Sequence, residues 1–374
     1  MKFTVSSSEL LRVILTVQKA IPAKATDAIL NNYLFELSGN TLTVTASDKE
    51  ITIRDIVEVD SAEEEGRIAV PSKQISDLLK ELPDVPVTIA TVNDSAFNCA
   101  WGGNGESTLP YYNPDDYPTI KSAEGDATVI SMPAEILSEG IGSTVYACSN
   151  DEARAIMNSI YFDIKPDSTT FVASDLQKLV CYTTADVKAS TACSFNLNKR
   201  HAAVVKAILG KDDTTVEIRF DDKFAELKSG NITVICCLVR GKYPDYTTII
   251  PKNNSNILSI SRVQLLNTIR RISVCAEKSS NHVKLDLTSD CLEISAQDLG
   301  FEIQAHEKVS CQYNGEDLTI GFKSPHLIEM LSNLSCETLV MKFADRRRSA
   351  LIMPSAEEEQ KDKVFGIVMP VMVR

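Results

Sequence analysis

The sequence predicts an α+β fold made of three repeated domains, each with two helices and antiparallel sheets. Four short landmarks recur along the chain in the same order and at nearly equal intervals, which is the mark of a repeat architecture. Most of each repeat alternates apolar and polar residues, as half-buried antiparallel strands do. Only two stretches per repeat have the spacing of an amphipathic helix. The length of 374 residues suits two or three domains of roughly 100–200 residues each.

The first two landmarks mark the starts of helices. One is a strand that runs directly into a helix, and its copies are 126 and 129 residues apart. The other is a short strand followed by Pro, Asn or Ser, residues that favour a helix start, and its copies are 127 and 125 residues apart. The aligned residues are Leu10, Ile136 and Leu265 for the first landmark, and Val70, Leu197 and Phe322 for the second.

The third landmark is a strand that ends in aspartate, at Asp48, Asp175 and Asp298. Three carboxylates could indicate metal-assisted catalysis, but the repeat places them in three separate domains. An aspartate that caps a turn after a strand is the more common arrangement. The sequence also lacks the GxSxG, HExxH and GxxxxGK[ST] motifs. We therefore expect no catalytic activity.

The end of each repeat supplies the fourth landmark. Residues 116–120 and 244–249 both contain an Asp-Tyr pair close to a proline, and the chain terminus holds the third place. These intervals predict domains at residues 1–125, 126–253 and 254–374. Two helices per repeat gives six helices, of which the first two are expected at residues 9–20 and 72–82.

Composition limits the class of protein. Ten cysteines without a CxxC pair argue against a disulfide framework, and four histidines without metal-ligand spacing argue against zinc. No apolar run reaches the roughly 18 residues of a membrane span, and the N-terminus is not a signal peptide. These features predict a cytoplasmic protein with no cofactor and no membrane contact.

Charge is unevenly distributed along the chain. The six expected helices and their ends carry +7, whereas the whole chain carries −13, so the remainder carries −20. Solvated surface lysines would explain part of this asymmetry. The alternative is that the helices line a basic concave surface, which could hold a phosphate backbone without reading sequence.

The last eight residues, 367–374, are almost wholly apolar, although chain termini are usually polar. We expect an edge strand that continues as an extended tail. The tail either packs into its own domain or forms one wall of a groove. Methionine side chains suit the second possibility because they adapt to varied partners.

Taken together, these features resemble the bacterial sliding clamp, the β subunit of DNA polymerase III, over the whole chain. The resemblance implies a head-to-tail homodimeric ring with helices facing a central hole that encloses double-stranded DNA. It implies loading by an ATP-driven clamp loader, tethering of the replicative DNA polymerase and other partners, and no chemistry. The motifs that carry it are residues 1–5, 108–110, 116–118, 243–246, 250–253, 320–322 and 368–370.

The family binds short, partly apolar partner peptides in a groove between its second and third domains. By resemblance, this groove would combine an apolar slot with a few polar groups that orient an extended peptide. The corresponding residues are Met157, Ser174, Leu176, Lys178, Leu179, Pro244, Thr248, Ile249, Ser349, Ile367, Met369, Pro370, Val371 and Met372.

The chain departs from the family pattern at this groove. The family's usual Gly-His-Arg-Leu segment reads Leu176, Gln177, Lys178 and Leu179 here. We expect the leucine to fill one end of the groove and the lysine to give weaker geometry for anion contacts than arginine. The tail ends in Val-Arg, where the family often has Arg-Leu, so peptide preference is expected to be shifted.

The same resemblance suggests contacts with the second protomer and with DNA. Ring closure is expected to use backbone pairing of edge strands and apolar contacts, with Val274 and Phe301 as candidates. The expected DNA contacts are Lys24, Lys199, Arg200, Lys206, Arg270 and Arg271. The alternative to a ring is a repeat-built protein-interaction scaffold that does not encircle DNA.

Overall fold

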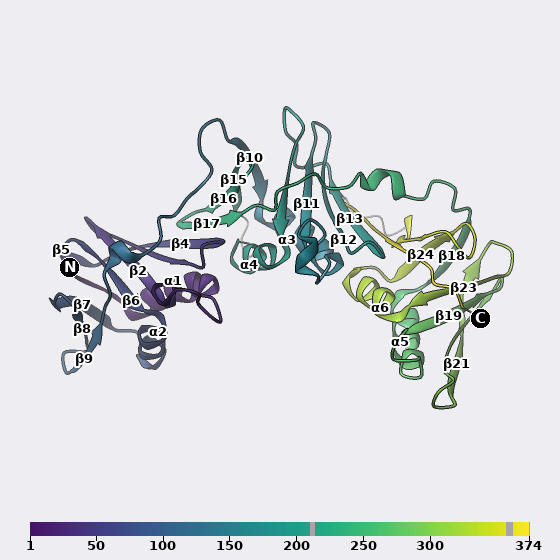
Figure 1. Cartoon of the computed structure of the whole chain (residues 1–374), viewed down its shortest axis with the longest axis horizontal. Helices are drawn as coiled ribbons and strands as arrows, with labels where there is room; N and C mark the ends of the chain where they lie inside the picture. Colours follow the sequence, from purple (N-terminus) through teal and green to yellow (C-terminus); the bar gives the residue numbers. More distant parts are fainter. Residues whose placement is uncertain (210–213, 357–361, 374) are drawn as a thin grey trace. The chain divides into compact units, whose positions relative to one another are not determined.

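The computed structural model describes residues 1–209, 214–356 and 362–373, which form two compact units. The first comprises Met1–Glu135 and Val204–Leu238, and the second comprises Ile136–Ala203 and Val239–Arg374 (Figure 1). Lys211 and the acidic run 357–359, which were counted in the charge balance, and Arg374 of the tail lie outside the described residues. Each unit combines strands of two predicted repeats because its larger sheet runs across a repeat boundary.

The first unit has two antiparallel sheets. The smaller has five strands in the order β5-β1-β7-β8-β9, and the larger has eight in the order β10-β15-β16-β17-β4-β3-β2-β6. Pairing of β17 with β4 joins the two repeats, with Val234 opposite Ile53. The strands are β1 (Lys2–Ser6), β2 (Asn32–Ser38), β3 (Thr41–Ser47), β4 (Ile51–Glu58), β5 (Ser61–Glu64), β6 (Gly66–Pro71), β7 (Pro86–Asn93), β8 (Ala96–Trp101), β9 (Gly105–Pro110), β10 (Thr128–Pro133), β15 (Thr215–Phe220), β16 (Phe224–Ser229) and β17 (Ile232–Cys237).

The second unit also has two antiparallel sheets. The larger has nine strands in the order β14-β11-β12-β13-β26-β25-β24-β18-β22, and the smaller has four in the order β21-β20-β19-β23. The strands are β11 (Ser159–Ile164), β12 (Thr169–Ser174), β13 (Lys178–Thr184), β14 (Cys193–Asn198), β18 (Asn256–Ser261), β19 (His282–Leu287), β20 (Cys291–Asp298), β21 (Ile303–Ser310), β22 (Gln312–Tyr313), β23 (Leu318–Lys323), β24 (Thr338–Phe343), β25 (Ala350–Pro354) and β26 (Lys363–Val368).

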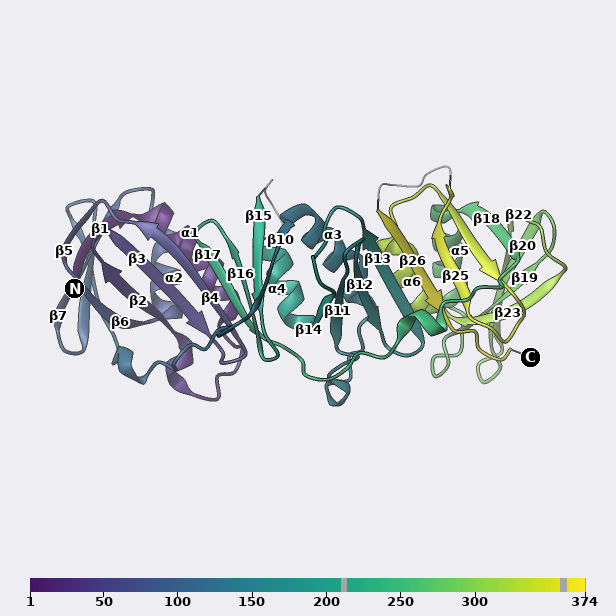
Figure 2. The ribbon, with the colours of Figure 1, turned by 90° about the horizontal axis from the view of Figure 1, so that it is seen from above.

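The C-terminal strand β26 is an interior strand, so the predicted edge strand is wrong. Strand β26 lies between β13 and β25 (Figure 2). Ile367 pairs with Leu179 of β13 on one side and with Leu351 of β25 on the other. Without β26, two neighbouring strands would each present an unpaired edge, and inserting it satisfies the backbone groups of both. The predicted extended tail follows. Its Met369 amide donates to Gln177 O at 2.9 Å and its Val371 amide to Gly321 O at 2.8 Å.

The described residues contain six α-helices, two per predicted repeat, which confirms that prediction. The helix-start landmarks mark core positions, since Leu10, Ile136 and Leu265 are all buried. In the second unit, α5 packs against α6 beside the strands (Figure 1). The helices are α1 (Ser7–Val17), α2 (Ser72–Glu81), α3 (Ala134–Thr144), α4 (Lys199–Leu209), α5 (Arg262–Ser273) and α6 (Ser324–Asn333).

Local sequence explains how these helices begin. The Ser6 hydroxyl accepts a hydrogen bond from the Glu9 amide and caps α1, and Ser261 caps α5 in the same way. Helix α1 then buries Leu10, Val13, Ile14 and Val17, which lie on one face at helical spacing. None of the ten cysteines, which all lie within the described ranges, forms a disulfide. None of the described helices has the length and apolar character needed to cross a bilayer.

Candidate functional site

The second unit contains a cleft of about 190 Å³ with mainly apolar walls. Five chain segments form it, namely the residues before β11, the end of β12 with the β12–β13 turn and β13, the connection before β18, the residue before β25, and the end of β26 with the start of the tail. Its lining residues are Met157, Ser174, Leu176, Gln177, Lys178, Leu179, Tyr243, Pro244, Asp245, Tyr246, Ile249, Ser349, Ile367 and Met369.

The floor of the cleft is a packed apolar cluster. Met157, Leu179 and Ile367 are buried in it together with two tyrosines. The ring of Tyr243 stacks on Tyr161 with centroids 4.9 Å apart. The hydroxyl of Tyr246 donates to Asp163 at 2.8 Å, and burial raises the pKa of Tyr246. Stacking and this hydrogen bond hold the two tyrosine rings in place on the floor of the cleft.

The β12–β13 turn supplies one end of the cleft, and its aspartate has the predicted turn-capping role. Asp175 Oδ1 accepts hydrogen bonds from the amides of Gln177 and Lys178 at 2.9 and 2.8 Å. In the other repeats, Asp48 accepts from two amides in the same way, and so does Asp298. The aspartate landmark therefore marks a recurrent turn.

Leu176 occupies the strained position of this turn. Its φ angle is +75°, a left-handed conformation that costs a side-chain-bearing residue about 1–2 kcal/mol. The Ser174 hydroxyl accepts the Leu176 amide at 3.0 Å and donates to Lys178 O at 2.8 Å, so the turn holds this conformation. The Leu176 side chain lines the cleft and is 51% exposed. The leucine that was expected to fill one end of the groove therefore lines the cleft with a side chain that remains about half exposed.

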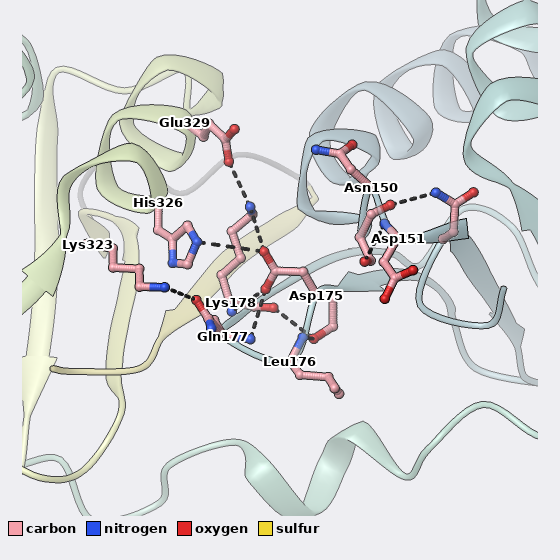
Figure 3. A network of polar contacts seen from close by, with 12 residues as sticks. Asn150, Asp151, Asp175, Leu176, Gln177, Lys178, Lys323, His326 and Glu329 are labelled. Atoms are coloured by element: carbon pink, nitrogen blue, oxygen red, sulfur yellow. Dashed lines mark hydrogen bonds and ion pairs between the residues drawn. The ribbon is translucent and has the colours of Figure 1, made fainter. Parts of the chain in front are cut away.

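Lys178 lines the cleft, but its charge is already engaged (Figure 3). Its Nζ atom lies 2.8 Å from Glu329 on α6 and 3.0 Å from Asp175. Burial alone would lower the pKa of Lys178, but the hydrogen bonds to Glu329 and Asp175 outweigh it and raise that pKa. His326 lies 3.8 Å from Asp175, and burial lowers the pKa of His326. The lysine therefore anchors α6 to the wall of the cleft.

Four of the fourteen residues predicted for the groove lie outside the cleft lining. The Thr248 hydroxyl donates to Asp245 O at 2.8 Å, and Val371 bridges to Gly321. Met372 lines a separate cavity of about 520 Å³ beside β19–β21. In the sequence, Pro370 lies between Met369, which lines the cleft, and Met372, which lines the other cavity. The other ten predicted residues are all in the lining.

Four lining residues were not predicted from the sequence, namely Gln177, Tyr243, Asp245 and Tyr246. Asp245 and Tyr246 belong to the landmark that ends the second repeat, Tyr243 directly precedes it, and Gln177 lies between two residues that were predicted. The Tyr-Pro-Asp-Tyr segment at residues 243–246 was a usable signal, because adjacent aromatic and proline residues favour an apolar wall.

The predicted DNA-contacting residues differ in their exposure and in the hydrogen-bond partners of their side chains. In the first unit, Lys24 and Lys206 are exposed. In the second unit Lys199 donates to Asn150 at 2.8 Å, Arg200 is exposed on α4, and Arg270 donates to Ser332 at 3.1 Å. Arg271 makes a two-pronged contact with Glu307 of β21, at 3.0 and 2.5 Å. This hydrogen-bonded arginine lowers the pKa of Glu307.

Each unit has a sheet with an open edge. Strand β9 ends the five-stranded sheet and β21 ends the four-stranded sheet. Beside β21, Phe301 is 75% exposed and Leu299 is 80% exposed, while Val274, after α5, is 81% exposed. Unpaired strand edges next to exposed apolar side chains favour pairing with another chain.

The whole length of the chain is similar to known proteins. Models of the N-terminal, central and C-terminal domains of the DNA polymerase III beta subunit match residues 1–121, 131–245 and 247–371. The "Beta sliding clamp" of Pseudomonas aeruginosa is 26% identical over 373 residues, which cover 99% of this chain and 100% of that one. The protein of the same name from Synechococcus elongatus is 26% identical over 386 residues, covering 100% of each chain.

Solved structures show the same fold. A sliding clamp (DNA polymerase III subunit beta) from Pseudomonas aeruginosa, bound to griselimycin, matches with a TM-score of 0.93 at 24% identity. The sliding clamp from Bacillus subtilis matches with a TM-score of 0.92 at 24% identity. Both matches cover 100% of this chain and 100% of the other.

Proposed function

This chain belongs to the DNA polymerase III β-subunit family, and we propose from this membership that it is a sliding clamp that acts as a processivity factor. Two copies would close into a ring around duplex DNA and tether the replicative DNA polymerase and other partners. The observation that carries the proposal is the match to all three family domains, in order, along one chain.

The cleft of the second unit is the proposed docking site for partner peptides. Its apolar floor suits one or two large apolar side chains of an extended peptide, and Gln177, Asp245 and Ser349 are polar groups that could orient its backbone. Four of the residues expected in the groove lie outside its lining, and we propose that they flank the docking site: Thr248, Pro370, Val371 and Met372.

For ring closure, the open edges β9 and β21 would pair between protomers, with Val274 and Phe301 in the apolar part of the contact. Support comes from their exposure and from the unpaired strand edge beside them. A head-to-tail arrangement of two copies closes when each presents two different edges. The domains of each protomer would be residues 1–125, 126–253 and 254–374.

The proposed DNA contacts are weak. Lys24, Lys199, Arg200, Lys206, Arg270 and Arg271 would contact phosphates without reading base sequence. Because a closed ring is retained by topology, strong affinity is unnecessary and would slow sliding. A clamp loader that consumes ATP would open and place the ring, and the chain itself would perform no chemistry and need no cofactor.

A primer-extension assay tests the function. The expected result is that the chain, with its cognate loader, ATP and polymerase, lengthens products made in a single binding event. Omission of ATP should abolish the gain. Unchanged product length with a loader proven on another clamp would contradict the proposal and favour a protein-interaction scaffold.

A further inference from the structure

Three consecutive arginines, Arg346, Arg347 and Arg348, lie in the loop between β24 and β25. All three are exposed, although the chain as a whole carries −13. The only acidic residue of this loop is Asp345, so three positive charges against one negative charge leave +2. Within the described ranges, no ion pair is found at Arg346 or Arg347, whereas Arg348 lies 3.5 Å from Asp345.

The backbone of this loop is held in place. Asp345 Oδ1 accepts hydrogen bonds from the amides of Arg347 and Arg348 at 2.7 and 3.1 Å. At the base of the loop, the Asn254 side chain donates to Lys342 O and Ser349 O, both at 2.9 Å. The arginine side chains therefore extend into solvent from a fixed turn.

The loop leads directly into the wall of the cleft. Ser349, the residue after Arg348, lines the cleft. Pairing of Ala350 with Val368, continued by one residue, places Ser349 next to Met369, which also lines the cleft. Because Arg348 directly precedes Ser349 in the chain, a peptide that leaves the cleft past Ser349 would next meet the arginines.

We propose that Arg346, Arg347 and Arg348 form a cationic rim that selects partner peptides carrying carboxylates beside their apolar anchor. This inference rests on the proposed peptide-binding function of the cleft. Arginine suits the role because its planar guanidinium binds a carboxylate through two parallel hydrogen bonds. Asp245, from another segment of the lining, gives the cleft one acidic position, so charge could also fix the direction of the peptide.

DNA phosphate is the competing ligand for three arginines. Two features of the structure favour the peptide. The arginines lie in a strand-to-strand loop that continues into the cleft lining, whereas all six proposed DNA contacts lie on α4 and α5 or in the first unit. The loop is therefore placed to contact a bound peptide where the peptide leaves the cleft.

A peptide-display selection tests the inference on a fully random library, so that no partner has to be chosen in advance. Random twelve-residue peptides are selected on the full-length protein, on R346S/R347S/R348S, and on the matched control K188S/K223S/K228S, which removes three exposed charges outside the lining. We expect Asp and Glu to be enriched next to the apolar core on the wild type and the control, but not on the arginine variant. Acidic residues enriched equally on all three proteins would overturn the inference.

Binding measurements with one selected peptide then give the size of the charge effect on affinity. Replacing its acidic residues by the matching amides should weaken binding about tenfold to the wild type and less than twofold to R346S/R347S/R348S, with the difference shrinking as salt is added. The amide peptide should bind both proteins equally. If instead the arginine variant loses only affinity for a DNA duplex, the arginines contact DNA and the inference fails.

The same experiment separates failure of the rim from failure of the cleft. Met369→Glu places a carboxylate in the lining, where Met369 is half exposed, and should abolish enrichment of every peptide class. Enrichment that survives Met369→Glu would contradict the proposed docking site itself. Enrichment that is lost with Met369→Glu but shows no acidic preference would contradict only the cationic rim.

Discussion

Lys178 Nζ on β13 lies 2.8 Å from Glu329 Oε2 on α6, and the lysine side chain is only 6% exposed. This ion pair joins the strand that forms the cleft wall to a helix of the third repeat. Lys178 therefore stabilises the shape of the cleft, and its positive charge is largely compensated before any peptide binds.

Removing one partner of this pair should reduce stability. We expect Glu329→Gln to lower the free energy of unfolding by about 1 kcal/mol, since Glu329 is 45% exposed and Asp175 still pairs with the lysine. Urea unfolding of Glu329→Gln, Lys178→Met and the double variant measures the coupling. Losses that add without coupling would show that the contact contributes nothing.

The stability of the second unit should also depend on pH through Asp175. Burial alone would raise the pKa of Asp175, but hydrogen bonds from Lys178 and from backbone amides outweigh it and lower that pKa. A lowered pKa in the folded state gives stability that is present above the ordinary aspartate value, near 3.9, and is lost as pH falls through the folded value.

The variant Asp175→Asn isolates this effect. It should melt at a lower temperature than the wild type at pH 7, and the difference should shrink as pH is lowered below about 4. Melting curves between pH 7 and pH 3 provide the test. A difference that stays constant over this range would mean that the carboxylate charge of Asp175 is irrelevant to stability.

Leu176 offers a test of peptide specificity with a control inside the same chain. Leu176→Gly should leave stability unchanged or raise it by up to about 1 kcal/mol, because glycine adopts a φ of +75° without strain. The same change should alter the set of peptides bound, since the projecting side chain is lost. Display selection and thermal melting measure the two effects.

Lys49 is the matched control because it holds the equivalent position of the first repeat, with φ +78°. Lys49→Gly should relieve similar strain without changing peptide selection. If both variants select the same peptides as the wild type, Leu176 is not a determinant of specificity.

Arg270 and Arg271 should contribute unequally to DNA binding. Arg271 is compensated by Glu307, whereas the contact made by Arg270 is with the neutral Ser332. We expect Arg270→Gln to weaken binding to a DNA duplex more than Arg271→Gln does, and Glu307→Gln to strengthen it at low salt. A salt titration of duplex binding checks the order. Equal effects of the two arginine changes would contradict it.

Features with a local cause were predictable from the sequence. The helix expected at residues 9–20 forms as α1 at Ser7–Val17, where the Ser6 cap sets the earlier start, and the strand-ending aspartates follow from turn chemistry. The helix and turn predictions succeeded because each depends on a few neighbouring residues. The resemblance named ten of the residues that line the cleft, and their role in peptide binding stays a prediction.

Features that depend on distant pairing could not be predicted in this way. The place of β26 between β13 and β25 follows from two unpaired edges that only the assembled sheet creates. The pairing of Lys178 with Glu329 and of Arg271 with Glu307 joins side chains far apart in the sequence. The two ion pairs change the roles assigned to Lys178 and Arg271, and residue type alone does not reveal that these side chains are paired.

The central claim is a closed ring around DNA, and one measurement tests it most directly. Labelled protein is loaded onto nicked circular DNA with the cognate loader and ATP, and the circle is then cut with a restriction enzyme. A closed ring predicts retention on the uncut circle and loss from the linear DNA, because a topological link ends when the DNA gains ends. Equal retention on both, with a loader proven active on another clamp, would contradict it.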